Sequence, residues 1–474
     1  MTPSLTPGEV FTNLLVALCV IPIVWGFVIK APKLVVCGFI GVLFCFSDST
    51  WGEIEASTSI YSRGSGMFYF SLLNLLLLAA GIAALMKRLA NPQGTQLAPP
   101  MTKYFLAFLF LLVGHVIVGL MVGIELDVIV SYRGIINLLN MLVFMYLVIL
   151  AFGDGKDAEK LLMLVIALAA IRGIFGAVRF FVFDGDTANP YRNFEGMDIK
   201  LFFFDISDNF VASLGAFCAA WLLTAPEARL SVFKRILLLA FLVMEIAAVA
   251  LSFRRSSLIG LGLMFVFLFL RLPGSRKFLF ALFAAVLLAT VMSVFYEHRL
   301  QFNNDNGDGM LTSLIYDIAP DKGIKESRFY ELYAAAQSME GNWLFGRGTW
   351  GSFTGDRDRL SYHGDDFSFV HSGFGHMVLK TGLVGLLLFC GMLTAYVSFY
   401  LRHRNRLIGN ARLVADAGFA GFLFWVPTLL IGTPIIEFRT MLLLGLAFAM
   451  PFIAVGIQHY QVRTHLARPP YAAA

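Results

Sequence analysis

His371 lies at the start of an apolar stretch, and the residues around it suggest that it could take part in chemistry. At about 100° per residue, Gly375, Gly382 and Gly385 lie on nearly the same helical face as His371. Such a stripe of small residues lets another helix pack closely in a membrane. A neutral imidazole at this position can accept a proton near physiological pH. His371 is therefore a candidate general base, although a lone histidine at a membrane boundary, like the nearby His376, more often serves only as a hydrogen-bonding group.

Arginines form the second group of candidates, because several lie within apolar stretches or at boundaries where basic residues are disfavoured. They are Arg133, Arg172, Arg179, Arg254 and Arg255. An intramembrane arginine is costly and needs a partner, and a guanidinium suits bidentate contact with phosphate oxygens. For Arg172 and Arg179 we favour pairing with a nearby carboxylate, or a side chain that extends outward to the membrane boundary, over anion binding. The candidate carboxylates are Asp184, Asp186, Asp205 and Asp208. The adjacent pair Arg254 and Arg255 instead favours an anion, such as a lipid pyrophosphate at the outer leaflet.

The elements that position these residues are transmembrane helices. The 474 residues are 58% hydrophobic and 14% charged, with a mean hydropathy of +0.76, which excludes a soluble globular fold. Continuous apolar runs favour helices over the alternating strands of a β-barrel. We expect an all-α polytopic bundle of about 12–14 spans, forming one membrane domain over residues 1–474. The predicted spans are 10–29, 34–47, 67–86, 104–122, 134–152, 161–182, 210–224, 236–252, 257–271, 277–296, 373–401, 415–435 and 440–458.

The basic residues of the short loops predict the orientation of this bundle. They cluster at residues 30–33, 87–88, 156–160, 229–235, 271–276 and 402–406, which all fall on one side. By the positive-inside rule this side is the cytoplasm, so the chain would span a bacterial inner membrane with loops 48–66, 183–209 and 297–372 in the periplasm. The last of these is an inserted loop, with apolar residues at helical spacing over 326–339 that predict a short amphipathic helix. A tight outer turn is expected at residues 253–256, because the apolar run around it is too long for one span.

The histidine segment resembles a motif of the O-antigen ligase and polymerase superfamily. In that family a His is followed by Asn, Ser or Gln, then nine residues, Gly, two residues, and Gly, Thr or Tyr. His371-Ser372, nine further residues, Gly382 and Gly385 fit this pattern without a gap.

Two further segments resemble the same family, and all three segments follow one another in the order that the family shows. Residues 255–260 resemble its Arg followed by small residues and an apolar helix, although Arg254 stands where a Ser is common. In the long loop, residues 327–330 and 342–348 resemble its Arg-led helix and its Pro-Leu-hydrophobic-Gly-x-Gly segment, with Trp343 in the place of the usual Pro. Together the three resemblances cover roughly residues 235–400.

The resemblance implies a GT-C-like membrane glycosyltransferase whose donor is an undecaprenyl-pyrophosphate-linked glycan. It would invert the anomeric centre and need no metal and no cofactor. His371 would take the acceptor's proton, and arginines would stabilise the departing pyrophosphate. The implied substrate-binding residues are Arg254, Arg255, Arg328, Arg347 and Arg133. The acceptor is left open between another lipid-linked glycan, which defines an O-antigen or exopolysaccharide polymerase, and the lipid A core or a protein, which defines a ligase. Other polysaccharide assembly proteins are further candidate partners.

Other functional classes fit the sequence less well. The run 304–309 imitates the start of an EF-hand, but Ile315 occupies the position that needs a bidentate Glu, so no calcium is expected there. No Walker-type loop, zinc-ligand spacing or basic nucleic-acid patch is present. The alternative is a lipid-linked-glycan flippase or another secondary transporter, which would also use intramembrane arginines. Paired half-repeats are not visible in the sequence, and transport explains the long outer loop poorly.

Overall fold

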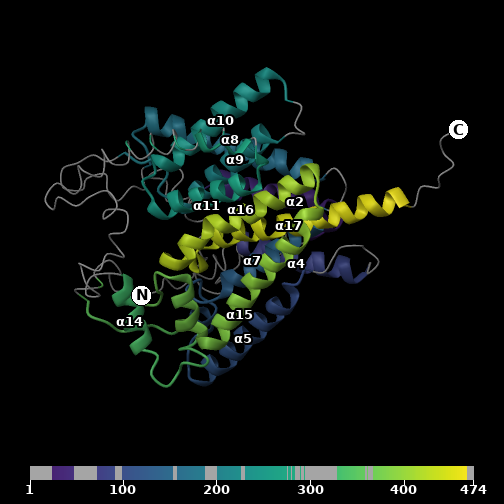
Figure 1. The fold of residues 1–474 in the computed structure, drawn as a ribbon. Coiled ribbons are helices and arrows are strands. Elements are labelled where there is room, and N and C mark those ends of the chain that lie inside the picture. Colours follow the sequence, from purple (N-terminus) through teal and green to yellow (C-terminus); the bar gives the residue numbers. More distant parts are fainter. Residues whose placement is uncertain are drawn as a thin grey trace.

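In a computed structural model of the protein, the helices form one bundle (Figure 1). The structure describes residues 24–46, 72–90, 99–152, 157–186, 200–225, 230–274, 328–357, 360 and 367–466, with scattered positions between 276 and 293. Within this part of the chain the structure is helical and contains no strand. The α-helices are α2 (Pro32–Cys45), α4 (Leu72–Ala90), α5 (Thr102–Met121), α6 (Leu126–Ile129), α7 (Ile136–Ala151), α8 (Asp157–Val182), α9 (Ile206–Thr224), α10 (Val232–Ala250), α11 (Arg255–Arg271), α14 (Arg328–Gln337), α15 (Gly373–His403), α16 (Gly409–Ile431) and α17 (Phe438–Leu466), with 3-10 turns η4 (Arg404–Arg406) and η5 (Pro434–Ile436).

Six of the described helices are long and apolar enough to cross a membrane. They lie at 102–121, 157–182, 206–224, 373–406, 409–431 and 438–458. A seventh crossing is possible if the helices at 24–30 and 32–45, which meet at 120°, form one broken span. The prediction of an all-α polytopic membrane protein is confirmed. Most predicted spans coincide with a described helix, whereas the spans near 10–29 and 277–296 lie mostly outside the described residues.

Local sequence sets the helix boundaries near the candidate site. The side chain of Asp205 caps α9 by accepting a hydrogen bond from the Ser207 amide at 2.9 Å. Between α10 and α11 the chain reverses over residues 251–254, where Phe253 has a left-handed backbone with φ of 50°. The predicted turn is therefore present, two residues earlier than expected. The predicted amphipathic helix is α14, and its Phe329 and Tyr333 side chains are exposed.

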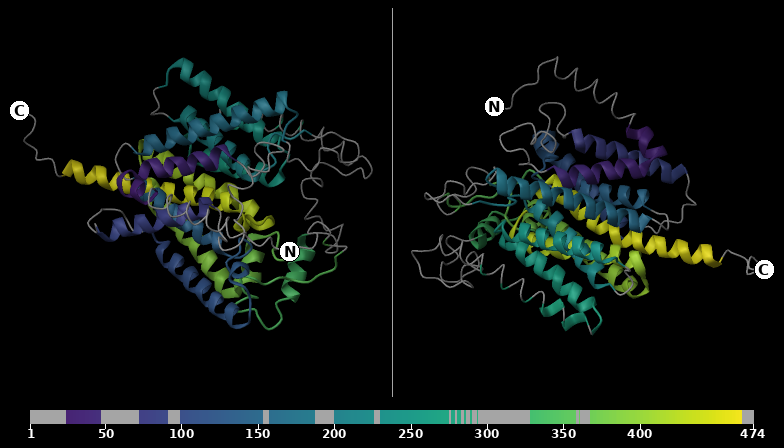
Figure 2. Two further views of the ribbon diagram at one scale, coloured as in Figure 1. Left: turned by 180° about the vertical axis from the view of Figure 1, so that it is seen from behind. Right: turned by 90° about the horizontal axis from the view of Figure 1, so that it is seen from above.

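The helices differ greatly in how much of their surface the protein covers. α17 runs through the centre of the bundle, with α8, α9 and α10 on one side and α5 and α15 on the other (Figures 1 and 2). Most of the apolar length of α17 is buried, whereas α5 and α15 leave most of theirs uncovered. Uncovered apolar helix surface is what a bilayer accommodates, so α5 and α15 lie at the lipid-facing edge.

The basic clusters of the sequence gather at one end of this bundle. Lys33 at the start of α2 bonds to Asp157 at the start of α8 at 2.9 Å. At the same end, Arg271 at the end of α11 lies 3.4 Å from Asp416 in the first half of α16. The opposite end of α16 leads to Thr433, whose hydroxyl donates to the carbonyl of Val370, the residue before the candidate histidine, at 2.5 Å. The basic clusters and His371 therefore lie at opposite ends of the helices.

Candidate functional site

His371 is held by a buried glutamate from α14. Its Nδ1 atom lies 3.2 Å from Oε2 and 3.3 Å from Oε1 of Glu331, and its backbone amide donates to Oε1 at 2.5 Å. The Glu331 side chain is fully buried, while that of His371 is 24% exposed. A carboxylate at Nδ1 favours the tautomer with the proton on Nδ1 and the lone pair on Nε2. This is the arrangement that a histidine base requires.

The start of α15 packs closely against α14, the helix that carries Glu331. Ser372, the second residue of the histidine motif, caps α15 by accepting a hydrogen bond from the Gly375 amide at 3.2 Å. A Cβ atom at Gly375 would collide with the side chain of Leu332 in α14. The expectation that Gly375 permits close packing of another helix is therefore confirmed. The helix involved is the one that supplies Glu331.

The second glycine of the motif breaks α15 instead of packing against a helix. Gly382 has φ of 63° and ψ of −161°, a conformation essentially restricted to glycine. The amide of Leu383 donates to the Trp343 carbonyl at 2.9 Å. The amide of Val384 donates to the Leu344 carbonyl at 3.1 Å. The prediction that a helix packs on this part of the stripe is wrong, because the loop after α14 lies there and satisfies the backbone groups that the break leaves.

Arg347 comes from the same loop and lies against α15. Its amide donates to the Leu379 carbonyl at 2.8 Å, and its Nη1 donates to the Ser338 carbonyl at 2.6 Å. The neighbouring Gly346 has φ of 75°, and a Cβ there would lie 2.6 Å from the amide nitrogen of Gly382. The Gly-x-Gly segment thus lets the loop backbone touch the broken helix, and this contact places Arg347 on the histidine side of the break.

Arg254 and Arg255 lie at the joint between α10 and α11. Arg254 is the N-cap residue of α11, and its guanidinium carbon stands 4.8 Å from the centre of the Phe204 ring. Arg255 is the first residue of the helix, and both side chains are half-buried. The next residue back from Phe204, Phe203, is fixed to the same joint because its amide donates to the Ser252 hydroxyl at 3.1 Å. An arginine over an aromatic face is stabilised by a cation–π interaction.

The remaining two predicted arginines lie nearer to the histidine helix. Arg133 precedes α7, and its Nε donates to the Tyr132 hydroxyl at 3.1 Å. The carbonyl of the next residue, Gly134, lies 3.3 Å from Nε2 of the buried His376, so this segment borders α15 and His376 acts as a hydrogen-bonding group. Arg328 begins α14, which carries Glu331, and its side chain lies outside what the structure describes. Arg133 and Arg347 are thus grouped with the start of α15, whereas Arg254 and Arg255 belong to a separate joint.

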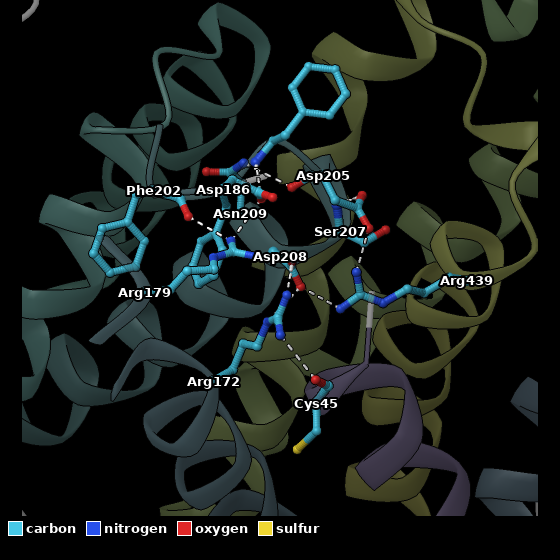
Figure 3. A network of polar contacts seen from close by, with 12 residues as sticks. Cys45, Arg172, Arg179, Asp186, Phe202, Asp205, Ser207, Asp208, Asn209 and Arg439 are labelled. Atoms are coloured by element: carbon cyan, nitrogen blue, oxygen red, sulfur yellow. Dashed lines mark hydrogen bonds and ion pairs between the residues drawn. The ribbon is translucent and has the colours of Figure 1, made fainter. Parts of the chain in front are cut away.

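A buried ion network accounts for Arg172 (Figure 3). Its Nη2 lies 2.6 Å from Oδ2 of Asp208, and its Nε donates to Oδ1 of the same carboxylate at 3.0 Å. Arg439 from α17 bonds to Asp208 at 2.6 Å and to Asp205 at 2.5 Å. Asp208 is fully buried, and the two arginine side chains are each 2% exposed. The expected carboxylate pairing of Arg172 is confirmed, and the network joins α8, α9 and α17.

Arg179 is paired in the same way, and its partner also supports the arginine joint. Its Nη2 lies 2.7 Å from Oδ2 of Asp186 and donates to the Phe202 carbonyl at 2.9 Å. The same Asp186 oxygen accepts a hydrogen bond from the Phe204 amide at 2.9 Å. Arg179 and Asp186 therefore fix the segment that presents the Phe204 ring to Arg254. Both partners are buried, so this pair is part of the scaffold.

Three residues of this region were missed by reasoning from the sequence: Glu331, Phe204 and Arg439. Glu331 carried a usable signal, because it is the one carboxylate within the ten residues of α14. Arg439 met the same criterion as the arginines that were selected, since it lies at the start of a predicted span on the disfavoured side. Phe204 offered no signal among the 47 phenylalanines of the chain.

Among the described residues, no group of three or more His, Cys, Asp or Glu side chains could hold a metal ion. The EF-hand-like run 304–309 lies outside the described residues.

Known proteins resemble part of this chain. No curated protein sequence matches the chain. Residues 236–390 match the family model described as O-antigen ligase, a range that includes α11, α14, His371 and both Gly382 and Gly385. This match supports the resemblance of that part of the chain to the O-antigen ligase and polymerase superfamily.

Proposed function

We propose that the protein transfers an undecaprenyl-pyrophosphate-linked glycan to an acceptor hydroxyl at the periplasmic face of a bacterial inner membrane. Members of the family whose model matches residues 236–390 are O-antigen ligases or polymerases, a glycosyltransferase-like activity. The observation that carries the proposal is the pairing of Glu331 with Nδ1 of His371 at 3.2 Å. It provides an oriented base at the end of the bundle opposite the basic clusters, which is the periplasmic end by the positive-inside rule.

The chemistry follows from this pairing. With its Nδ1 proton held by Glu331, His371 takes the proton of the acceptor hydroxyl on Nε2 as that oxygen attacks the anomeric carbon. The new carbon–oxygen bond forms as the bond to the pyrophosphate breaks on the opposite face, so the anomeric configuration inverts. The leaving group departs as undecaprenyl pyrophosphate. The negative charge of Glu331 stabilises the imidazolium that forms.

The arginines hold the donor's pyrophosphate in this proposal. Guanidinium groups stabilise the charge that develops on the leaving group, and they do so most strongly where water is largely excluded. Arg254 and Arg255 at the start of α11 are the main candidates. Arg133, Arg328 and Arg347 are placed on the elements that surround His371. Arg172 and Arg179 take no part, because buried carboxylates neutralise them.

The test uses purified protein, a lipid-linked glycan donor and a panel of acceptors. We expect product to form without added divalent metal and His371→Ala to abolish it. His403→Ala is the matched control, because His403 lies at the far end of the same helix, where it bonds to the Phe399 carbonyl at 2.8 Å and packs against the Phe399 ring. Both variants should unfold at the temperature of the parent. Full activity of His371→Ala would disprove the assignment, and the acceptor consumed distinguishes a polymerase from a ligase.

A further inference from the structure

The loop after α14 presents three consecutive apolar side chains that the protein does not cover. Trp343, Leu344 and Phe345 are 46%, 56% and 57% exposed. We call these three residues the apolar tip. Three large apolar side chains in a row are unusual on a water-facing loop, and a patch of this kind marks a surface that meets lipid or another protein.

The apolar tip lies against α15 at the break at Gly382. The backbone carbonyls of Trp343 and Leu344 accept hydrogen bonds from the amides of Leu383 and Val384. The exposed apolar surface continues along α15 beyond the break, where Leu383 is 43% and Leu387 70% exposed. The tip is therefore continuous with helix surface that a bilayer covers.

The length of α15 places the break at the edge of the hydrocarbon. The stretch from Gly382 to Leu401 contains no charged residue, and Arg402 follows it at the basic end. At about 1.5 Å per residue this stretch is about 30 Å long, which equals the usual thickness of the hydrocarbon core. On the other side of the break, the buried Lys380 donates from Nζ to the Gly351 carbonyl at 2.6 Å. A charged group two residues before Gly382 agrees with a boundary at the break.

We propose that the apolar tip inserts into the bilayer leaflet on the His371 side, at the boundary between headgroups and acyl chains. Trp343 suits this layer, in which tryptophan is enriched. The hydrogen bonds to α15 satisfy the Trp343 and Leu344 carbonyls, as irregular backbone at this depth requires. As a consequence, the part of α15 that precedes Gly382 stands outside the hydrocarbon core. His371 then works in the layer where the headgroup of a lipid-borne substrate emerges.

The test measures the depth of the tip in proteoliposomes. The full-length protein with its five native cysteines replaced by alanine carries a single cysteine, labelled with the environment-sensitive fluorophore NBD, from Leu344→Cys or from Ser352→Cys as the exposed control in the same loop. We expect the label at position 344 to be quenched several-fold more by lipids spin-labelled near the headgroup than by aqueous iodide. The label at position 352 should show the reverse.

Two results would overturn the proposal. If iodide quenches the label at position 344 as strongly as it quenches the label at position 352, the tip lies in water. If neither quencher reaches position 344, a protein surface covers the tip, either that of a second copy or that of another protein. Neither result bears on the proposed transfer reaction, because the measurement needs no substrate.

Discussion

Nδ1 of His371 and Oε2 of Glu331 lie 3.2 Å apart, the histidine two residues before α15 begins and the glutamate inside α14. Since Glu331 acts on the substrate only through the histidine, it is a positioning residue. We expect Glu331→Gln to lower kcat by about 10²-fold or more, the scale of general-base effects, with the KM for the donor nearly unchanged. Glu340→Gln, at an exposed position just beyond the same helix, is the control and should keep full activity. A raised KM with unchanged kcat would contradict this role.

Asp208 is the carboxylate that Arg172 and Arg439 share, and its loss should destabilise the fold. Asp208→Asn leaves two buried guanidinium groups with too little negative charge, which costs about 3–5 kcal/mol for a broken buried pair. The measurement is the unfolding free energy by SDS titration in mixed micelles. Asp184→Asn is the control, because Asp184 is 67% exposed in its pair with Lys200 and such pairs contribute about 1 kcal/mol or less. Equal stability of the two variants would show that the network contributes little.

The sequence was sufficient for the membrane class and most helix positions, because these depend on apolar length, and a short local motif in it made His371 the candidate base. It also indicated that Arg172 and Arg179 would pair with carboxylates, since an unpaired charge in this setting is too costly. The break at Gly382 could not be predicted, because helical periodicity assumes an unbroken axis. The partner of His371 was likewise inaccessible: Glu331 is 40 residues away in the chain, and their contact depends on how α14 folds back onto α15.

The break in α15 gives a third prediction, at Gly382 itself. Gly382→Ala should weaken the seating of the loop, because an alanine at φ of 63° is strained by about 1–3 kcal/mol and its Cβ would also collide with the Leu344 carbonyl. We expect faster trypsin cleavage after Arg347, together with reduced transfer activity. The control is Gly262→Ala in α11, where nothing lies within 4 Å of the added Cβ and helix propensity favours alanine. Cleavage at the parental rate in Gly382→Ala would argue against the loop contact.

The last prediction concerns how Arg254 is held, and it rests on the proposed role of that arginine in binding the donor's pyrophosphate. The Phe204 ring lies 4.8 Å from the guanidinium carbon, so Phe204→Leu removes a cation–π contact of about 0.5–2 kcal/mol while keeping an apolar side chain. We expect the donor KM to rise by about 3- to 10-fold, with kcat much less affected. Phe204→Tyr keeps the aromatic ring and should therefore keep the parental KM. If Phe204 served only to fill space, an aromatic ring would not be needed at this position.

Arg254→Ala should raise the donor KM at least as much as Phe204→Leu does. Adding Phe204→Leu to Arg254→Ala should have little further effect, since the two changes remove the same contact. If Phe204→Leu raises KM equally in the Arg254→Ala background, the ring acts on the donor by another route. Arg255→Ala, measured alongside, then shows whether the second arginine of the pair contributes independently.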